Sequence, residues 1–95
     1  MEYFNASDDI SFGSQPEPAD LKALAARGVK TIINTRFPEE DQGDLPPERA
    51  RAQAESLGMR YVNVPVSPVE FSPASLAEVS RALDEARAHG PTFVH

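Results

Sequence analysis

The stretch VKTIINT, residues 29–35, decides the fold of this chain. It is rich in β-branched side chains, and its apolar character is nearly continuous instead of alternating. β-Branched residues favour strands, and a strand without alternation is typical of a sheet whose two faces are both covered. Because helices cover both faces of parallel sheets, this stretch predicts a buried parallel strand.

Helix signals stand on both sides of this strand. The preceding segment QPEPADLKALAARG, residues 15–28, predicts a short amphipathic helix with a proline in its first turn and a glycine just past its last. After a polar loop, the prolines at 46 and 47 open a second helix that ends at Gly58. The segment MRYVNVPV, residues 59–66, then supplies another strand.

A third helix and a last strand complete the pattern. Ser72 is a good N-cap, Pro73 takes the first helical position, and the helix extends as far as Gly90. Its inward stripe consists of Leu76, Val79, Leu83 and Ala86. The closing segment GPTFVH, residues 90–95, reads as the start of a buried strand, and the chain opens with an extended stretch around residues 3–12.

This order of elements predicts one small α/β domain over residues 1–95. Strands that alternate with helices imply right-handed crossovers and a mainly parallel sheet with helices on both faces. Ligands of such sheets bind beyond the carboxyl ends of the strands. Three segments should therefore meet at one crevice, namely residues 34–44, residues 67–72 and whatever follows His95. We expect the domain to be incomplete at its C-terminus.

The composition narrows the classes of partner. A formal net charge of −6 and a pI near 4.7 argue against a nucleic-acid or anionic-membrane surface, because both demand clustered lysine and arginine. The sequence shows no apolar run long enough to span a bilayer and no signal peptide, so we expect a cytoplasmic protein. It contains no cysteine, which excludes disulfides and a cysteine nucleophile within these residues.

No cofactor or metal is expected. The sequence carries no glycine-rich dinucleotide or P-loop motif, no HExxH and no GxSxG. Its two histidines, His89 and His95, lack the spacing of a metal site.

Candidate site residues lie in the loop that follows the first buried strand. Arg36 directly follows the strand in INTR, where its guanidinium is placed either to bind a phosphate or to pair with Glu39, Glu40 or Asp41. The acidic run EEDQGD is either a solvated loop or a mobile loop whose Asp41 or Glu39 delivers a proton as a general acid.

A second set of candidates lies in SPVEFSP, residues 67–73. Glu70 precedes a helix N-terminus, so it serves as a proton donor to a leaving group or as a capping or solvated residue. Phe71 either lines a substrate pocket or packs as a hydrophobic staple against the helix that follows.

Three stretches together resemble a known family. SFGSQPEPADLKALAARGVKTIINTR, GMRYVNVPV and GPTFVH are similar, in order and separation, to the bacterial phosphatase-like domain of beta-lactamase-hydrolase-like proteins. This domain is similar in turn to the dual-specificity, cysteine-dependent phosphatases. The resemblance runs from about Phe4 to His95.

The resemblance implies a role for the end of the chain. In the family, the strand ending in Val-His leads directly into the signature C-x-x-x-x-x-R, whose cysteine is the nucleophile and whose arginine grips two phosphate oxygens. His95 matches the signature histidine, which orients the cysteine. The resemblance thus implies hydrolysis of phosphomonoesters through a cysteinyl-phosphate intermediate, with this chain alone inactive.

One position departs from the family. Ser67 matches the position that an aspartate general acid usually occupies, and a serine hydroxyl is too weak an acid to replace it. Glu70 or Asp41 would then act as the acid, with Ser67, Phe71 and Arg36 binding substrate. The departure also leaves room for sulfur transfer through a cysteine persulfide, from a sulfur-donor substrate.

A third hypothesis is a non-catalytic interaction module. Without the helix that follows the signature loop, one face of the sheet should expose apolar side chains. Such a face favours a homodimer through the incomplete sheet.

Overall fold

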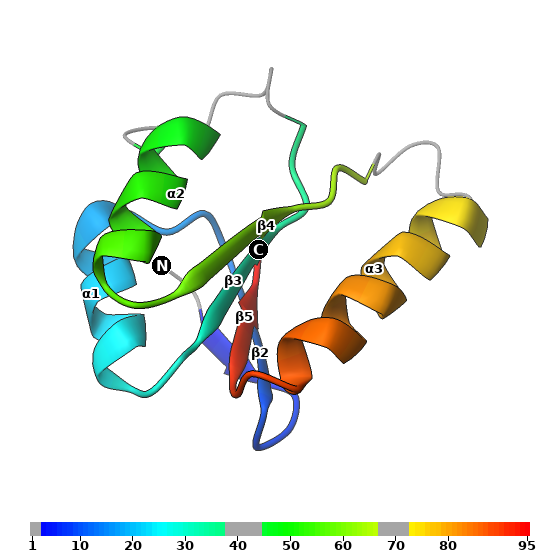
Figure 1. The fold of residues 1–95 in the computed structure, drawn as a ribbon, viewed down its shortest axis with the longest axis horizontal. Coiled ribbons are helices and arrows are strands. Elements are labelled where there is room, and N and C mark those ends of the chain that lie inside the picture. Colours follow the sequence, from blue (N-terminus) through cyan, green and yellow to red (C-terminus); the bar gives the residue numbers. More distant parts are fainter. Residues whose placement is uncertain (1–2, 38–44, 67–72) are drawn as a thin grey trace.

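A computed structural model describes residues 3–37, 45–66 and 73–95, apart from the side chain at position 75. These residues form a five-stranded sheet between two layers of helices (Figure 1). The strands are β1 (Tyr3–Asn5), β2 (Ile10–Gly13), β3 (Thr31–Asn34), β4 (Arg60–Asn63) and β5 (Thr92–Val94). The helices are α1 (Pro18–Ala26), α2 (Pro47–Ser56) and α3 (Pro73–Arg87).

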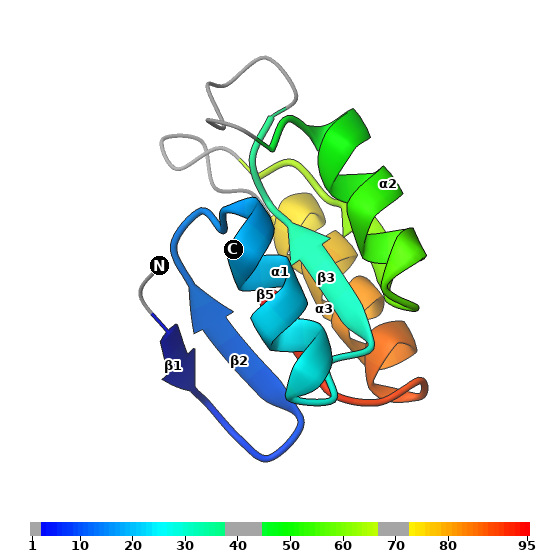
Figure 2. The ribbon, with the colours of Figure 1, turned by 90° about the vertical axis from the view of Figure 1, so that its left-hand side faces the viewer.

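The sheet is mainly parallel, as the alternation of elements predicted. Its strand order is β1-β2-β5-β3-β4, and only the edge strand β1 runs antiparallel to its neighbour. Helices α1 and α2 cover one face and α3 covers the other (Figures 1 and 2). This strand order places the last strand, β5, in the centre of the sheet. The direction of the connections reverses between β5 and β3, because β4 lies on one side of β3 and β5 lies on the other. Ligand sites in open parallel sheets form at such a reversal.

The larger half of the core lies between the sheet and the two helices α1 and α2. Phe93 of β5 pairs with Ile32 of β3, which in turn pairs with Tyr61 of β4, and all three side chains are buried on this face. The helices complete this core with Leu21, Leu24, Ala50 and Ala54. The near-continuous apolar run of β3 is explained by this arrangement, because both of its faces are buried.

The smaller half of the core lies under α3. Ile33 and Val94 pair across β3 and β5 and pack with Ala86 of the last turns of α3. The predicted inward stripe holds for these last turns but was wrong for Leu76, which is 52% exposed. Figure 1 shows the reason, because the first turns of α3 diverge from the sheet.

Proline and glycine mark the helix boundaries as the sequence predicted. Each of the three helices begins at a proline, because a residue at this position needs no backbone N–H donor. The residue that follows the C-cap of α1 is Gly28, and the one that follows the C-cap of α2 is Gly58. Their φ angles are 94° and 81°, a conformation that glycine adopts without a steric penalty.

The N-terminal extended stretch is a hairpin. Strands β1 and β2 pair with Phe4 opposite Phe12, and the backbone N–H of Ala6 donates to the carbonyl of Ile10 across the turn at 2.9 Å. Among the described parts of the chain, no helix has the length and apolar character needed to cross a bilayer.

Candidate functional site

The carboxyl ends of the three strands β2, β5 and β3 converge at one side of the molecule. At this end the carbonyl of His95 accepts two hydrogen bonds from Thr35, one from its backbone N–H and one from its hydroxyl, each at 2.8 Å. The backbone N–H of His95 donates to Ile33 at 3.0 Å. The backbone of His95 therefore continues the parallel hydrogen-bonding pattern between β5 and β3 by one residue.

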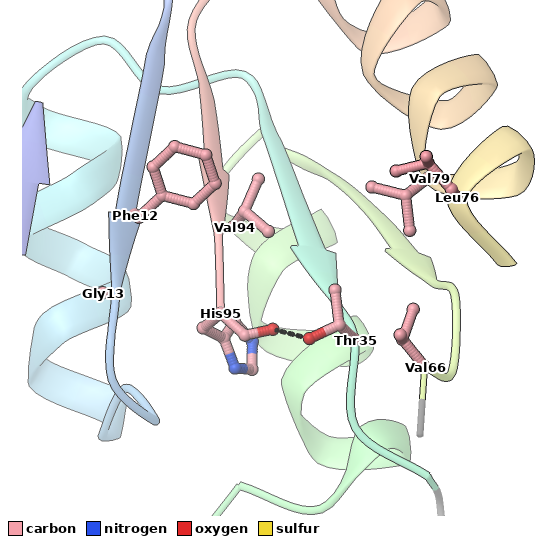
Figure 3. A pocket seen from close by; sticks show the side chains of 8 residues that line it. All are labelled: Phe12, Gly13, Thr35, Val66, Leu76, Val79, Val94 and His95. Carbon is pink, nitrogen blue, oxygen red and sulfur yellow. Dashed lines mark hydrogen bonds between the residues drawn. The ribbon is translucent and has the colours of Figure 1, made fainter. Parts of the chain in front are cut away.

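An apolar cavity of about 340 Å³ lies beside Thr35 and His95, on the face of the sheet covered by α3 (Figure 3). Val94 contributes from β5, Phe12 from β2, and Val79 from α3, and their side chains point into the space between the sheet and the helix (Figure 3). The remaining lining residues are Gly13, Thr35, Val66, Leu76 and His95. The cavity therefore sits at the reversal of strand order, where the fold predicts a ligand.

The imidazole of His95 lies on the opposite face of the sheet from Val94, because side chains alternate along a strand. It stacks on Phe93, with ring centroids 5.9 Å apart and an interplanar angle of 25°. Burial, and then the positive charge of Arg36, lower the pKa of His95 to about 4. Its Nδ1 is buried, and no described group forms a hydrogen bond with it. At neutral pH the imidazole is therefore uncharged, with one nitrogen available to a further partner.

Arg36 lies where β3 leaves the sheet, and its backbone is held at both ends. Its N–H donates to Oδ1 of Asn34 at 2.8 Å, and its carbonyl accepts from Nδ2 of Asn63 at 2.9 Å. Within residues 3–37, 45–66 and 73–95, the guanidinium forms no salt bridge. Its predicted pairing with Glu39, Glu40 or Asp41 involves residues that the structure does not describe.

A buried polar cluster that was not predicted from the sequence lies beside Arg36. Nδ2 of Asn34 donates to the hydroxyl of Tyr61 at 2.7 Å, and the Asn34 side chain is fully buried. Asn63 lies directly opposite Asn34 in the parallel register. Burial raises the pKa of Tyr61 and keeps its hydroxyl protonated. The signal was an asparagine at the end of each of two consecutive strands.

The structure places Val66, the residue that precedes the predicted segment 67–72, beside Thr35 of the predicted segment 34–44. The N–H of Val66 donates to the carbonyl of Thr35 at 2.8 Å, so the chain beyond β4 runs beside the chain beyond β3 and next to His95. The other predicted site residues are Asp41, Ser67, Glu70 and Phe71, with Ser72 as the predicted N-cap. They lie outside the described residues, and their roles stay predictions. No group of three or more metal-binding side chains occurs in the part of the chain that is described.

Solved structures with this architecture define the class of fold. The DUF442 protein of Shewanella putrefaciens CN-32, provisionally assigned as a phosphatase, superposes with a TM-score of 0.85 at 19% identity, covering 98% of this chain and 57% of its own. TpbA of P. aeruginosa, solved with bound pTyr, superposes with a TM-score of 0.73 at 20% identity, covering 94% of this chain and 49% of its own. The chain is an α/β domain with a phosphatase fold.

The family is more specific than the fold. Residues 3–95 match the phosphatase-like domain of beta-lactamase hydrolase-like proteins, and the chain belongs to this family. A beta-lactamase hydrolase-like protein of Agrobacterium fabrum C58 is 30% identical over 95 residues, which are all of this chain and 22% of the relative. The chain thus spans about a fifth of the length of the curated relatives that it matches. The resemblance drawn from the three sequence stretches is confirmed.

Proposed function

We propose that this chain forms the scaffold of a phosphomonoester hydrolase that works through a cysteinyl-phosphate intermediate. The observation that carries the proposal is the placement of His95. It extends the central strand, β5, at the reversal of strand order and lies next to a cavity of about 340 Å³. In a longer protein whose cysteine loop directly follows His95, that loop would begin at the mouth of this cavity.

His95 and Arg36 have different roles in this proposal. With a pKa near 4, His95 is neutral at pH 7 and supplies no positive charge to a neighbouring thiolate. Its imidazole instead forms a hydrogen bond that orients the loop. The guanidinium of Arg36 presents parallel donors that suit a phosphate dianion. The positive charge that favours a bound phosphate within these residues therefore comes from Arg36.

The proton donor is proposed from the sequence alone. Asp41 or Glu70 would protonate the leaving oxygen, because Ser67 is too weak an acid. Ser67 and Phe71 would contact the substrate beside Arg36.

The 95-residue chain should not hydrolyse an aryl phosphate, because it contains no cysteine. A longer form that carries the cysteine loop after His95 should hydrolyse it and should lose the activity when that cysteine is replaced by serine. Release of the aryl alcohol, measured against a protein-free blank, checks both forms. Hydrolysis by the 95-residue chain would contradict the proposal. Sulfur transfer from thiosulfate by the longer form, without hydrolysis, would instead establish the sulfur-transferase alternative.

A second candidate function, self-association, is favoured by exposed apolar side chains on the face covered by α3. Phe4 is 62% exposed and Phe12 is 42% exposed, and the two lie opposite each other in the hairpin. Leu76 is 52% exposed and lines the same cavity as Phe12. We propose that a second copy of the chain covers this patch, because one patch that meets itself across a two-fold axis forms a closed dimer.

The 95-residue chain should therefore form a dimer that a charge in this patch disrupts. Phe12→Asp should give a monomer by light scattering at concentrations where the unchanged chain is dimeric, because a desolvated carboxylate at the contact costs several kcal/mol, on the order of its effective burial penalty. Ala23→Asp is the matched control, since it adds the same charge on the exposed face of α1. A monomeric unchanged chain at high concentration would rule out the dimer.

A further inference from the structure

The side-chain amide of Asn63 bridges two backbone carbonyls at the point where the chain leaves β3, those of Asn34 and Arg36. Its Nδ2 donates to the carbonyl of Asn34 at 2.8 Å and to the carbonyl of Arg36 at 2.9 Å. These carbonyls lie on either side of Thr35. One side chain from the neighbouring strand therefore fixes the path of the chain into the loop.

The side-chain amide of Asn34 also forms a hydrogen bond with the segment that ends at Arg36. Its Oδ1 accepts the N–H of Arg36 at 2.8 Å, and its Nδ2 donates to the Tyr61 hydroxyl at 2.7 Å. Asn34 is fully buried and Tyr61 is buried, so water does not compete for the hydrogen bond between these two side chains. Tyr61 of β4 thus supplies one of the hydrogen bonds that orient the Asn34 amide.

Three hydrogen bonds of this cluster serve the short segment that ends at Arg36. Burying an amide is costly unless its polar atoms are satisfied, and an apolar side chain would fill the Asn34 position at lower cost. The cluster instead determines where the loop begins. Arg36 directly follows Thr35, whose backbone N–H and hydroxyl both donate to the carbonyl of His95 at 2.8 Å, so the segment that the cluster fixes leaves the sheet beside His95. The positive charge of Arg36 lowers the pKa of His95.

We propose that Asn63, with Asn34 and Tyr61, is a set of positioning residues that fixes the backbone of Arg36 so that its guanidinium lies beside His95 at the phosphate site. The proposal rests on the proposed role of Arg36 in binding phosphate. A purely structural role would lower stability and leave the geometry of Arg36 unchanged in the molecules that remain folded.

The first test uses the pKa of His95 to report whether the guanidinium of Arg36 lies close to it, and it needs no ligand. The imidazole resonances of His95 are followed by NMR as a function of pH in the 95-residue chain and in its variants. Arg36→Gln should raise the pKa of His95, because it removes a repelling positive charge. Asn63→Ala should raise the pKa of His95 by a comparable amount, although the guanidinium of Arg36 is intact in this variant.

Gln53→Ala is the matched control. It removes one amide-to-carbonyl hydrogen bond of 2.8 Å, from Nε2 of Gln53 to Pro18, between α1 and α2. Its His95 titration should coincide with that of the unchanged chain. If Asn63→Ala does not fold, Tyr61→Phe removes only a hydroxyl and should give a smaller rise in the same direction.

The second test measures binding of inorganic phosphate to the same proteins at pH 7.5. Arg36→Gln should weaken binding by roughly tenfold or more, as expected for loss of a charged hydrogen-bond donor. Asn63→Ala should weaken it by roughly threefold to tenfold, and Gln53→Ala should bind like the unchanged chain.

The two tests separate the two proposals. If Asn63→Ala or Tyr61→Phe titrates like the unchanged chain while Arg36→Gln shifts, the positioning role is wrong. The positioning role is also wrong if Arg36→Gln leaves the pKa of His95 unchanged. If the titrations shift as expected but the unchanged chain does not bind phosphate, the positioning role stands and the phosphate role of Arg36 fails.

Discussion

Replacing Phe93 with alanine should lower the free energy of unfolding by about 3–5 kcal/mol. Phe93 is fully buried on the central strand, and its ring stacks on Tyr3 at 6.1 Å and on His95 at 5.9 Å. The substitution removes the ring from the cluster that it forms with Leu21 and Leu24 of α1, and the cavity left behind adds to the cost. Small domains have a total stability of about 5–15 kcal/mol. Urea unfolding followed by circular dichroism measures the loss.

Phe12→Ala is the matched control for this substitution. Phe12 pairs with Val94, the residue next to Phe93, but its side chain is 42% exposed on the other face. In the monomer the same atoms are removed from a site that already contacts solvent, so at concentrations where the chain is monomeric the loss should stay below about 1.5 kcal/mol. Equal losses for the two variants would contradict the assignment of the main core to the face of α1 and α2.

The fold could be predicted from the sequence because its signals are local. The apolar run of residues 29–35 shows that both faces of its strand are covered, and the glycines at 28, 58 and 90 mark where helices end. Alternation of strands and helices then leaves few topologies. The central place of the last strand was less accessible, because it depends on pairing between β5 and two strands far away in sequence.

The site was predicted only in outline. Arg36 and His95 each follow a strand, so the rule for parallel sheets places them at the same end. Asn34 and Asn63 each end a predicted strand, but only the parallel register makes them neighbours, and the sequence does not show that register. The exposure of Leu76 likewise depends on the direction of α3 relative to the sheet, which helical periodicity does not contain.

Lowering the pH from 7 to 4 should remove about 3 kcal/mol of stability through His95 alone. Burial, and then the charge of Arg36, lower its pKa from 6.5 to about 4 in the folded chain. Between these values the unfolded chain binds more protons than the folded chain, so stability rises with pH in this window. The contribution is fully present above about pH 6.5 and is lost as the pH falls towards 4.

His95→Gln isolates this contribution, because every other titrating group is common to both proteins. The free energy of unfolding is measured by urea for both chains from pH 4 to pH 7.5. The difference between them should change by about 3 kcal/mol across this range, in favour of the unchanged chain at high pH. A difference that stays constant would show that the pKa of His95 is the same in the folded and the unfolded chain. Burial and the charge of Arg36 would then not lower this pKa, and the buried position described for the imidazole would be wrong.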